Sequence, residues 1–263
     1  TEIVEAADDI DLEDLIERHN CVITLSHVGY IKRLPADTYS AQHRGGRGII
    51  GATTRDEDYI EQVAAVGSHS DLMMFTNRGR VHTRRAYLIP EASRTSKGTG
   101  ILNILELEKD EKVTAMISVD GYSDDEYLTM VTRRGVIKKT LLSEFEYQRR
   151  GGKIAINLDE GDELLFVIKT AGDSNIVIAT RSGAAIKFNE TNVRCMGRTA
   201  RGVRGITLKG SDEVVGAVLV GDDKMLVTIT VNGFGKQTSF DDFFFNDTAT
   251  TEIYTCHNIT EKT

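Results

Sequence analysis

Residues 127–136 read Tyr127-Leu128-Thr129-Met130-Val131-Thr132-Arg133-Arg134-Gly135-Val136 and set a pattern that returns along the whole chain. Short runs of β-branched and aromatic residues that end in a glycine turn are typical of hairpin strands. The same sequence of an apolar run, a glycine turn and a basic run occurs four more times, with the turn glycine at Gly29, Gly79, Gly183 and Gly233.

The repeat has a nearly constant length, because the turn glycines are 50, 56, 48 and 50 residues apart. A fixed period in this range indicates stacked units such as propeller blades or solenoid turns. Most repeats carry two further apolar runs, as at 154–158 and 164–168. We therefore predict an all-β, propeller-like disc of four-stranded blades, with about five blades present and the last one truncated.

The composition is that of a globular protein with a packed core, since 40% of the 263 residues are hydrophobic. The sequence contains no apolar run long enough to span a bilayer and no N-terminal signal, so we expect no membrane partner. Cys21, Cys195 and Cys256 are odd in number and form no CxxC pair. A disulfide framework and a zinc knuckle are therefore not expected, and a reducing cytoplasmic setting fits best.

The charges are segregated along the chain, although the net charge is −8. The windows 29–48, 78–97, 132–153 and 181–209 hold 24 of the 32 Lys and Arg residues but only 5 of the 40 Asp and Glu residues. Scattered surface charge would not separate by sign in this way. Such segregation indicates a local binding surface for a polyanion within an acidic protein.

The first window contains a basic, glycine-rich heptapeptide that looks suited to hold a phosphate chain. Its glycines can adopt positive φ and leave backbone N–H groups uncovered, so a large anion can approach closely. Its arginines add donors that match phosphate oxygens. Taken alone, the segment is equally compatible with a solvated hairpin loop. It consists of Gln42, His43, Arg44, Gly45, Gly46, Arg47 and Gly48.

Weaker echoes of this heptapeptide follow at residues 94–101, 148–154 and 198–206, each at a similar place after its turn glycine. In a radial array, equivalent loops lie on one rim. Basic loops in phase would form a curved track for a long polyanion. We predict that further phosphate contacts along this track come from Arg80, Arg84, Arg85, Lys97, Lys138, Lys139, Arg149, Arg150, Lys153, Arg201 and Arg204.

The two ends of the chain fall outside the repeats, which leaves residues 20–240 as the repeat domain. Residues 1–19 are acidic, and residues 12–17 suggest a short helix or linker. Residues 241–263 begin where a fifth basic loop is due but have no glycine pair and no Arg. We expect this tail to be foreign sequence, because it resembles translated adapter or vector sequence.

Enzymatic motifs are absent from the sequence. Residues 46–51 fit GxGxxG, but β-forming residues follow them, whereas a dinucleotide-binding loop is followed by a helix. The six His residues show no metal-binding spacing, and no GxSxG elbow occurs. We therefore predict no catalytic residue and no metal site on this chain.

The period, the glycine turns and above all residues 42–48 resemble the C-terminal domain of the DNA gyrase A subunit. That family carries a box of the form Gln-Arg-Arg-Gly-Gly-Lys-Gly in its first blade. Here His43 stands at the second position and Arg47 replaces Lys, and both are mild departures. The likeness covers about residues 1–240, because residues 1–19 resemble the end of the breakage-reunion domain and its linker.

The resemblance implies a β-pinwheel, in which neighbouring blades exchange strands, and DNA wrapped on its basic rim. Wrapping would present a positive crossing, so that ATP-dependent DNA gyrase introduces negative supercoils. The family's catalytic tyrosine would lie upstream of residue 1, and this chain would need no cofactor. ATP and Mg would act through the gyrase B subunit, in a holoenzyme of two A and two B subunits. The resemblance also implies a bacterial, nucleoid-associated location in the cytoplasm.

Three other functions remain open. The nearest is the C-terminal DNA-bending domain of topoisomerase IV, in which the box is degraded or absent. The second is a propeller whose basic rim binds acidic protein partners. The third is a propeller enzyme with a site at its central channel, which would need converging carboxylates or histidines at equivalent blade positions. We find no such set in the sequence.

Overall fold

In a computed structural model of the chain, the residues described are 12–38, 58–147, 149, 151–221, 224–230, 232–242 and 254–255. They form short β-strands and 3-10 helices, which confirms the all-β prediction. The chain divides into two compact units. Unit 1 comprises Thr1–Met74, His82–Lys109 and Met116–Gly121, and unit 2 comprises Phe75–Val81, Asp110–Ala115 and Tyr122–Thr263.

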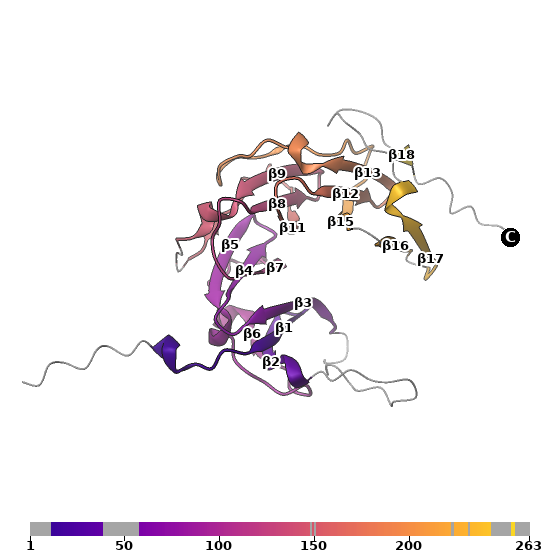
Figure 1. The fold of residues 1–263 in the computed structure, drawn as a ribbon. Coiled ribbons are helices and arrows are strands. Elements are labelled where there is room, and N and C mark those ends of the chain that lie inside the picture. The colour runs from indigo at the N-terminus through magenta and orange to yellow at the C-terminus, as the bar shows by residue number, and fades with distance from the viewer. Residues whose placement is uncertain are drawn as a thin grey trace, which may run out of the picture. The chain divides into compact units, whose positions relative to one another are not determined.

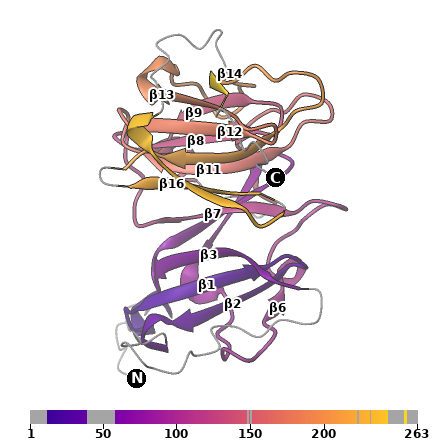
Figure 2. The ribbon, with the colours of Figure 1, turned by 90° about the vertical axis from the view of Figure 1, so that its right-hand side faces the viewer.

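Unit 1 contains a four-stranded antiparallel sheet with the order β3-β1-β2-β6 (Figure 2). Its strands are β1 (Asn20–Ser26), β2 (Tyr30–Pro35), β3 (Ile60–Gly67) and β6 (Thr99–Gly100). A second sheet has the order β10-β5-β4-β7, and its residues belong partly to unit 1 and partly to unit 2. Its strands are β4 (Asp71–Thr76), β5 (Arg80–Arg85), β7 (Val113–Val119) and β10 (Lys153–Ile154).

Unit 2 contains two further four-stranded sheets, with the orders β11-β8-β9-β14 and β15-β12-β13-β18, and a two-stranded sheet (Figure 1). The first is built from β8 (Tyr127–Thr132), β9 (Val136–Leu141), β11 (Leu164–Thr170) and β14 (Val203–Arg204). The second is built from β12 (Asn175–Thr180), β13 (Ala184–Asn189), β15 (Val214–Leu219) and β18 (Tyr254–Thr255). The two-stranded sheet pairs β16 (Met225–Ile229) with β17 (Gly235–Ser239).

Four complete blades and a two-stranded fifth agree with the expected number of about five, the last truncated. The strands expected before each turn correspond to β1, β4, β8, β12 and β16. Only the first residue of the apolar run 154–158 lies in a strand, because β10 ends at Ile154. The 3-10 helices are η1 (Leu12–Leu15), η2 (Ala36–Thr38), η3 (Ala86–Leu88), η4 (Ile101–Asn103), η5 (Leu142–Phe145), η6 (Glu190–Asn192) and η7 (Phe240–Asp242).

In the first three sheets the fourth strand comes from the following repeat, which is the strand exchange expected of a pinwheel. In the first sheet β6 pairs with β2, although it follows β5 in the sequence. In the third sheet β14, which follows β13, pairs with β9 through Val203 opposite Ile137. The second, third and fourth repeats therefore each complete the sheet of the repeat before them, whereas the fourth sheet is completed by β18 in the tail.

All five glycines of the predicted turns adopt positive φ, with values of 97°, 73°, 80°, 87° and 81° in chain order. In three repeats an aspartate holds the turn from the loop before the next strand. Asp162 Oδ1, for example, accepts hydrogen bonds from the backbone N–H of Arg134 at 3.0 Å and of Glu163 at 2.8 Å. The carboxylate thereby satisfies turn donors that no sheet partner reaches.

The core of unit 2 lies between its two four-stranded sheets. In unit 2 one cluster joins β8 and β9 to β12, β13 and β15, with Val131, Ile137, Ile178 and Phe188 among its buried members. Ile206, just beyond the exchanged strand β14, belongs to the same cluster. The exchanged segment is therefore held by apolar burial as well as by its two strand pairs.

The predictions for the two ends of the chain stay predictions. Only 12–19 of the expected linker are described, and they include η1. In the tail only β18 and the first two residues are described, and β18 pairs with β13.

We expect Gly79→Ala to destabilise the fold more than Gly183→Ala, although both glycines occupy the same place in their turns. Both have positive φ, so both substitutions carry the backbone cost of about 1–2 kcal/mol. A Cβ at Gly79 would also lie 2.5 Å from the carbonyl oxygen of Ile156, whereas a Cβ at Gly183 would meet nothing within 4 Å. Displacing that backbone should add about 1–3 kcal/mol to the loss of unfolding free energy. Urea denaturation measures the difference, and equal losses would contradict the tight crossing.

Candidate nucleic-acid interface

The basic loops predicted from the sequence are the segments that carry the chain to the exchanged strands. Three of them are described, at residues 93–98, at 149 with 151–152, and at 198–202, and they lead into β6, β10 and β14. We call them the second, third and fourth crossing loops, after the repeat in which each lies. Each ends in a glycine with positive φ, at Gly98, Gly152 and Gly202. Aligning the three loop sequences on these glycines gives them a common register.

The box itself lies outside the described residues, so its predicted contacts from Gln42, His43, Arg44, Gly45, Gly46, Arg47 and Gly48 stay predictions. The same holds for Arg150. In the common register Gly46 corresponds to Gly98, Gly152 and Gly202. In the sequence, the box therefore aligns with the three described loops.

Four of the predicted cations are exposed on or beside the crossing loops. Lys97 is exposed, and its Nζ lies 3.9 Å from the ring centroid of Tyr30, an exposed-site cation–π contact. Arg149 is exposed on the third crossing loop. Arg201 and Arg204 are exposed on either side of Gly202. All four guanidinium or ammonium groups are accessible to a phosphate.

Arg201 on the fourth crossing loop and Arg204 in β14 differ in their partners. Arg201 is 76% exposed at its side chain and forms an ion pair of 3.0 Å with Asp159, itself 54% exposed. Such a surface pair is weak, so a phosphate can compete for the arginine. Within the part of the chain that the structure describes, the guanidinium of Arg204 makes no hydrogen bond or ion pair. Arg204 is therefore the better-prepared phosphate ligand of the two.

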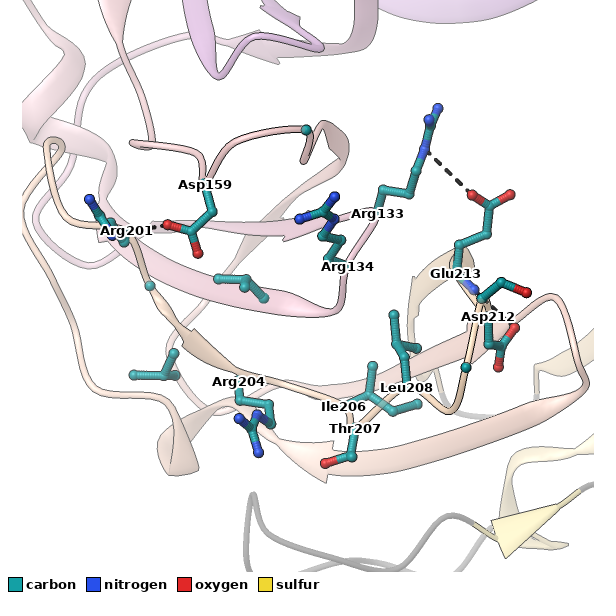
Figure 3. Close-up of a pocket in the computed structure, with 16 residues that line it drawn as sticks. Arg133, Arg134, Asp159, Arg201, Arg204, Ile206, Thr207, Leu208, Asp212 and Glu213 are labelled. Carbon is teal, nitrogen blue, oxygen red and sulfur yellow. Dashed lines mark hydrogen bonds and ion pairs between the residues drawn. The ribbon is translucent and has the colours of Figure 1, made fainter.

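A cavity of about 910 Å³ lies beside this loop, between the turn at Arg133 and Arg134 and the segment 201–213 (Figure 3). Its lining is mixed in charge. Arg133 Nε lies 3.7 Å from Glu213, and Arg134 Nη1 donates to the carbonyl oxygen of Glu160 at 2.9 Å. These arginines are thus engaged by acidic or carbonyl groups of unit 2. The cavity therefore lies along one side of the crossing loop, and we do not assign it as a separate anion-binding site.

Arg80 and Lys153 support the third crossing loop from within. The guanidinium of Arg80 donates to the carbonyl oxygen of Gly151. The amine of Lys153 donates to the carbonyl oxygen of Phe145 at 3.2 Å. Burial, and then the positive charges of Arg198 and Arg149, lower the pKa of Lys153. Both residues lie beside the loop, as predicted, but their donors are partly committed to the backbone.

Arg84 and Arg85 lie at the end of β5. Arg85 forms ion pairs with Asp71 at 3.4 Å and Glu13 at 3.5 Å, and it donates to the carbonyl oxygen of His69 at 3.0 Å. Two carboxylates offset its charge, so its attraction for a phosphate is reduced. Arg84 donates to the carbonyl oxygen of Thr83 at 2.9 Å and is half-buried.

Lys138 and Lys139 correct the sequence-based set, because both side chains are buried. Lys138 is 0% exposed, and its amine donates to the carbonyl oxygens of Ala155, at 2.6 Å, and Arg198. Lys139 is 6% exposed and donates to the carbonyl oxygen of Glu190 at 2.9 Å. A buried, hydrogen-bonded ammonium cannot reach a phosphate outside. We therefore leave both residues out of the proposed DNA contacts.

Two loop arginines escaped the sequence-based set. Arg94 and Arg198 stand four residues before Gly98 and Gly202, which is the position of Gln42 before Gly46. Arg198 is half-buried, with Nη1 3.4 Å from the carbonyl oxygen of Ile154. Aligning the loops on these glycines, rather than on the turn glycines, would have found both.

The described residues hold no group of three or more His, Cys, Asp or Glu side chains that could bind a metal ion. Nor is any helix among the described elements long and apolar enough to cross a membrane.

Comparison with known proteins identifies the repeat. A family model described as "DNA gyrase C-terminal domain, beta-propeller" matches the chain five times, at residues 22–66, 70–120, 126–171, 174–220 and 224–244. These segments coincide with the five repeats, and the last match is the shortest. The resemblance seen in the sequence is thereby confirmed.

Curated relatives give the same result. The DNA gyrase A subunit of Clostridium acetobutylicum is 48% identical over 205 residues, which cover 78% of this chain and 25% of that protein. The DNA gyrase A subunit of Staphylococcus aureus (strain NCTC 8325 / PS 47) is 45% identical over 259 residues, covering 97% of this chain and 29% of that protein. The chain thus spans less than a third of the length of these relatives.

Two solved structures share the fold. The C-terminal domain of DNA topoisomerase IV aligns with a TM-score of 0.72 and 27% identity, over 88% of this chain and 71% of that chain. A DNA gyrase A C-terminal domain aligns with a TM-score of 0.69 and 27% identity, over 86% of this chain and 73% of that chain.

Proposed function

The chain belongs to the DNA gyrase C-terminal domain family, and on that premise we propose that it binds and wraps double-stranded DNA with little sequence preference. The observation that carries the proposal is the repetition of exposed cations on the crossing loops, at Lys97, Arg149, Arg201 and Arg204. Cations that contact phosphates position DNA without reading its bases. Loops repeated in register suit a continuous backbone better than a compact anion.

The crossing loops are also fixed enough to act on DNA mechanically. Each runs directly into a strand that the preceding sheet holds by backbone pairing. Bending a site of 20–30 base pairs costs on the order of 1–6 kcal/mol. Phosphate contacts made from loops anchored in this way can offset that cost.

The proposed consequence is topological. DNA wrapped on the crossing loops would present a positive crossing to the rest of a gyrase, whose ATP-dependent strand passage then leaves negative supercoils. In that setting the partners are gyrase B and a second gyrase A, and the location is the bacterial nucleoid. ATP and Mg would act on gyrase B. The contribution of this chain is to set geometry, and no residue of it takes part in cleavage.

A second candidate is the DNA-bending role of a topoisomerase IV C-terminal domain, favoured by the structural alignment with such a domain. The intact heptapeptide at 42–48 favours the wrapping role. Bending without a closed wrap would leave the linking number of nicked circles unchanged after ligation, so the two roles are separable.

We expect DNA affinity to fall steeply with salt. If about eight phosphates are neutralised, the slope of log K against log salt concentration should be near −7. Arg204→Ala should make this slope shallower by about 1 and weaken binding equally on unrelated sequences. Fluorescence anisotropy with two duplexes of different sequence measures both effects.

Lys169→Ala is the matched control, since it removes one positive charge from β11, away from the crossing loops. Lys169 is already paired with Glu126 at 2.8 Å. Its slope should equal that of the unmodified chain. An equal effect of both substitutions would mean that overall charge, and not the loops, governs DNA binding.

A further inference from the structure

Two buried lysines occupy the same place in their repeats, three residues after the turn glycine. Lys32 is 3% exposed and Lys138 is 0% exposed. Neither amine is available to a ligand outside the fold. Each instead contacts the crossing loop of the next repeat.

The two amines share one equivalent contact. Lys32 Nζ donates to the carbonyl oxygens of Arg94 and Ser96, both at 2.8 Å, and lies 3.4 Å from that of Ser93. Lys138 Nζ donates to the carbonyl oxygen of Arg198. Arg94 and Arg198 share one loop position, because each precedes its positive-φ glycine by four residues. The same hydrogen bond from a buried lysine to a crossing loop, called the lysine tie here, therefore occurs once in unit 1 and once in unit 2.

Lys138 also joins two successive crossing segments. Besides Arg198 it binds the carbonyl oxygen of Ala155 at 2.6 Å. Ala155 follows β10, and its N–H donates to Gly79 O at 2.8 Å. One ammonium thus links the segment leaving the third crossing loop to the start of the fourth.

Such an amine constrains the loop strongly. An ammonium has three donors and no acceptor, so in a buried position it must collect carbonyl oxygens around it. Where several carbonyl oxygens of one loop bind the same nitrogen, as around Lys32, the loop backbone bends around the amine. Around Lys32, the side chains of Thr95 and Lys97 are exposed. On the fourth crossing loop, Thr199 and Arg201 are exposed in the same way.

We propose that Lys32 and Lys138 are positioning residues for DNA binding: each holds the next repeat's crossing loop in the shape that presents its exposed cations to the DNA backbone. The inference deepens the proposed function and rests on it. The basic runs of the sequence would then contain two kinds of cation, those that contact DNA and those that shape the loops.

The protonation state of Lys138 agrees with this role. Burial first, and the charge of Arg198 second, lower its pKa to about 8, whereas Glu144 and Cys195 act in the opposite direction. At pH 7 the amine therefore remains mainly protonated and keeps its three donors.

An apolar residue at this position is compatible with a blade. In the fourth repeat the equivalent residue is Ile186, which packs against the core cluster of unit 2. Lys138→Met should therefore fold and lose the tie alone. Lys32→Met tests the same tie in unit 1, so the question does not depend on the folding of one variant.

The test compares these variants with Lys187→Met in the complete 263-residue chain. Lys187 is a matched control, because it is 6% exposed and donates at 2.9 Å to the carbonyl oxygen of Phe240, in η7 rather than in a crossing loop. Circular dichroism melting reports the stability of each variant. Hydrogen exchange of peptides covering 93–98 and 198–202 reports loop order, and the salt dependence of duplex binding reports phosphate contacts.

We expect Lys138→Met to speed exchange in 198–202 at least tenfold and to make the salt slope shallower by about 2, the loss of about two phosphate contacts. Lys32→Met should act likewise on 93–98. Lys187→Met should lower the melting temperature and leave the slope unchanged. If both test variants keep the slope of the unmodified chain, the inference is wrong while the proposed function stands. A flat slope for the unmodified chain would overturn the proposed function itself.

Discussion

Replacing Arg44 and Arg47 together with Ala is expected to remove most of the linking difference that the proposed wrapping would impose on nicked circular DNA when the nick is sealed. The two arginines stand on either side of Gly45 and Gly46, in the segment whose sequence aligns with the crossing loops of the later repeats. In the proposed wrap the DNA contacts several loops one after another, so losing the contacts at one loop would release the DNA there and leave the wrap incomplete. The salt slope of binding should also become shallower by about 2. Separation of topoisomers after ligation measures the main effect.

The matched control removes two arginines elsewhere. Arg133 pairs with Glu163 at 2.6 Å, and Arg181 pairs with Glu213, so both guanidinium groups are engaged by carboxylates at turns. Arg133→Ala with Arg181→Ala changes the net charge as much as the box variant does and should keep the topoisomer distribution. If the box variant also kept that distribution, the central role of residues 42–48 would be wrong.

Glu190→Ala is expected to cost about 3–5 kcal/mol of unfolding free energy, the largest stability effect among single substitutions considered in this chain. Glu190 is 0% exposed. Its Oε1 accepts from the N–H groups of Gly172 at 2.9 Å and Ser174 at 2.8 Å, and its Oε2 accepts from the hydroxyl of Thr170 at 2.7 Å. Lys139 Nζ lies 4.0 Å from Oε2. Truncation would leave these three donors without their acceptor and the buried Lys139 ammonium without its neighbouring carboxylate.

Denaturation followed by circular dichroism suits this measurement, because the chain has no Trp. Glu126→Ala serves as the control, since Glu126 forms a half-exposed pair with Lys169 at 2.8 Å and such pairs contribute about 0–1 kcal/mol. A loss below about 1 kcal/mol for Glu190→Ala would show that the buried network is replaced by water or repacking.

The repeating part of the fold was accessible from the sequence, because each repeat carries a local signal. Gly29 and Gly135 mark turns that require positive φ, and both adopt it. The strand exchange had no local signal of its own. β14 is only two residues long, and its partner β9 lies more than 60 residues earlier in the sequence. It was expected only through the family resemblance.

The candidate site was accessible in part, for a similar reason. Charge and spacing singled out Arg201 and Arg204, which are exposed on a crossing loop. They also singled out Lys138, which is buried. The sequence shows the charge of a lysine but not its acceptors, and those of Lys138 are carbonyl oxygens of Ala155 and of Arg198 in the next repeat. The local sequence around Lys138 therefore does not show that its side chain is buried, because the burial depends on backbone from another repeat.

The most direct test of the proposed wrapping is ligation of nicked circular DNA over increasing amounts of the unmodified chain, followed by separation of the topoisomers. We predict a progressive shift to positive linking difference, with the shift lost at high salt together with binding. Saturated binding, shown by anisotropy in the same buffer, with an unchanged topoisomer distribution would contradict a positive wrap and leave the chain as a DNA-bending domain.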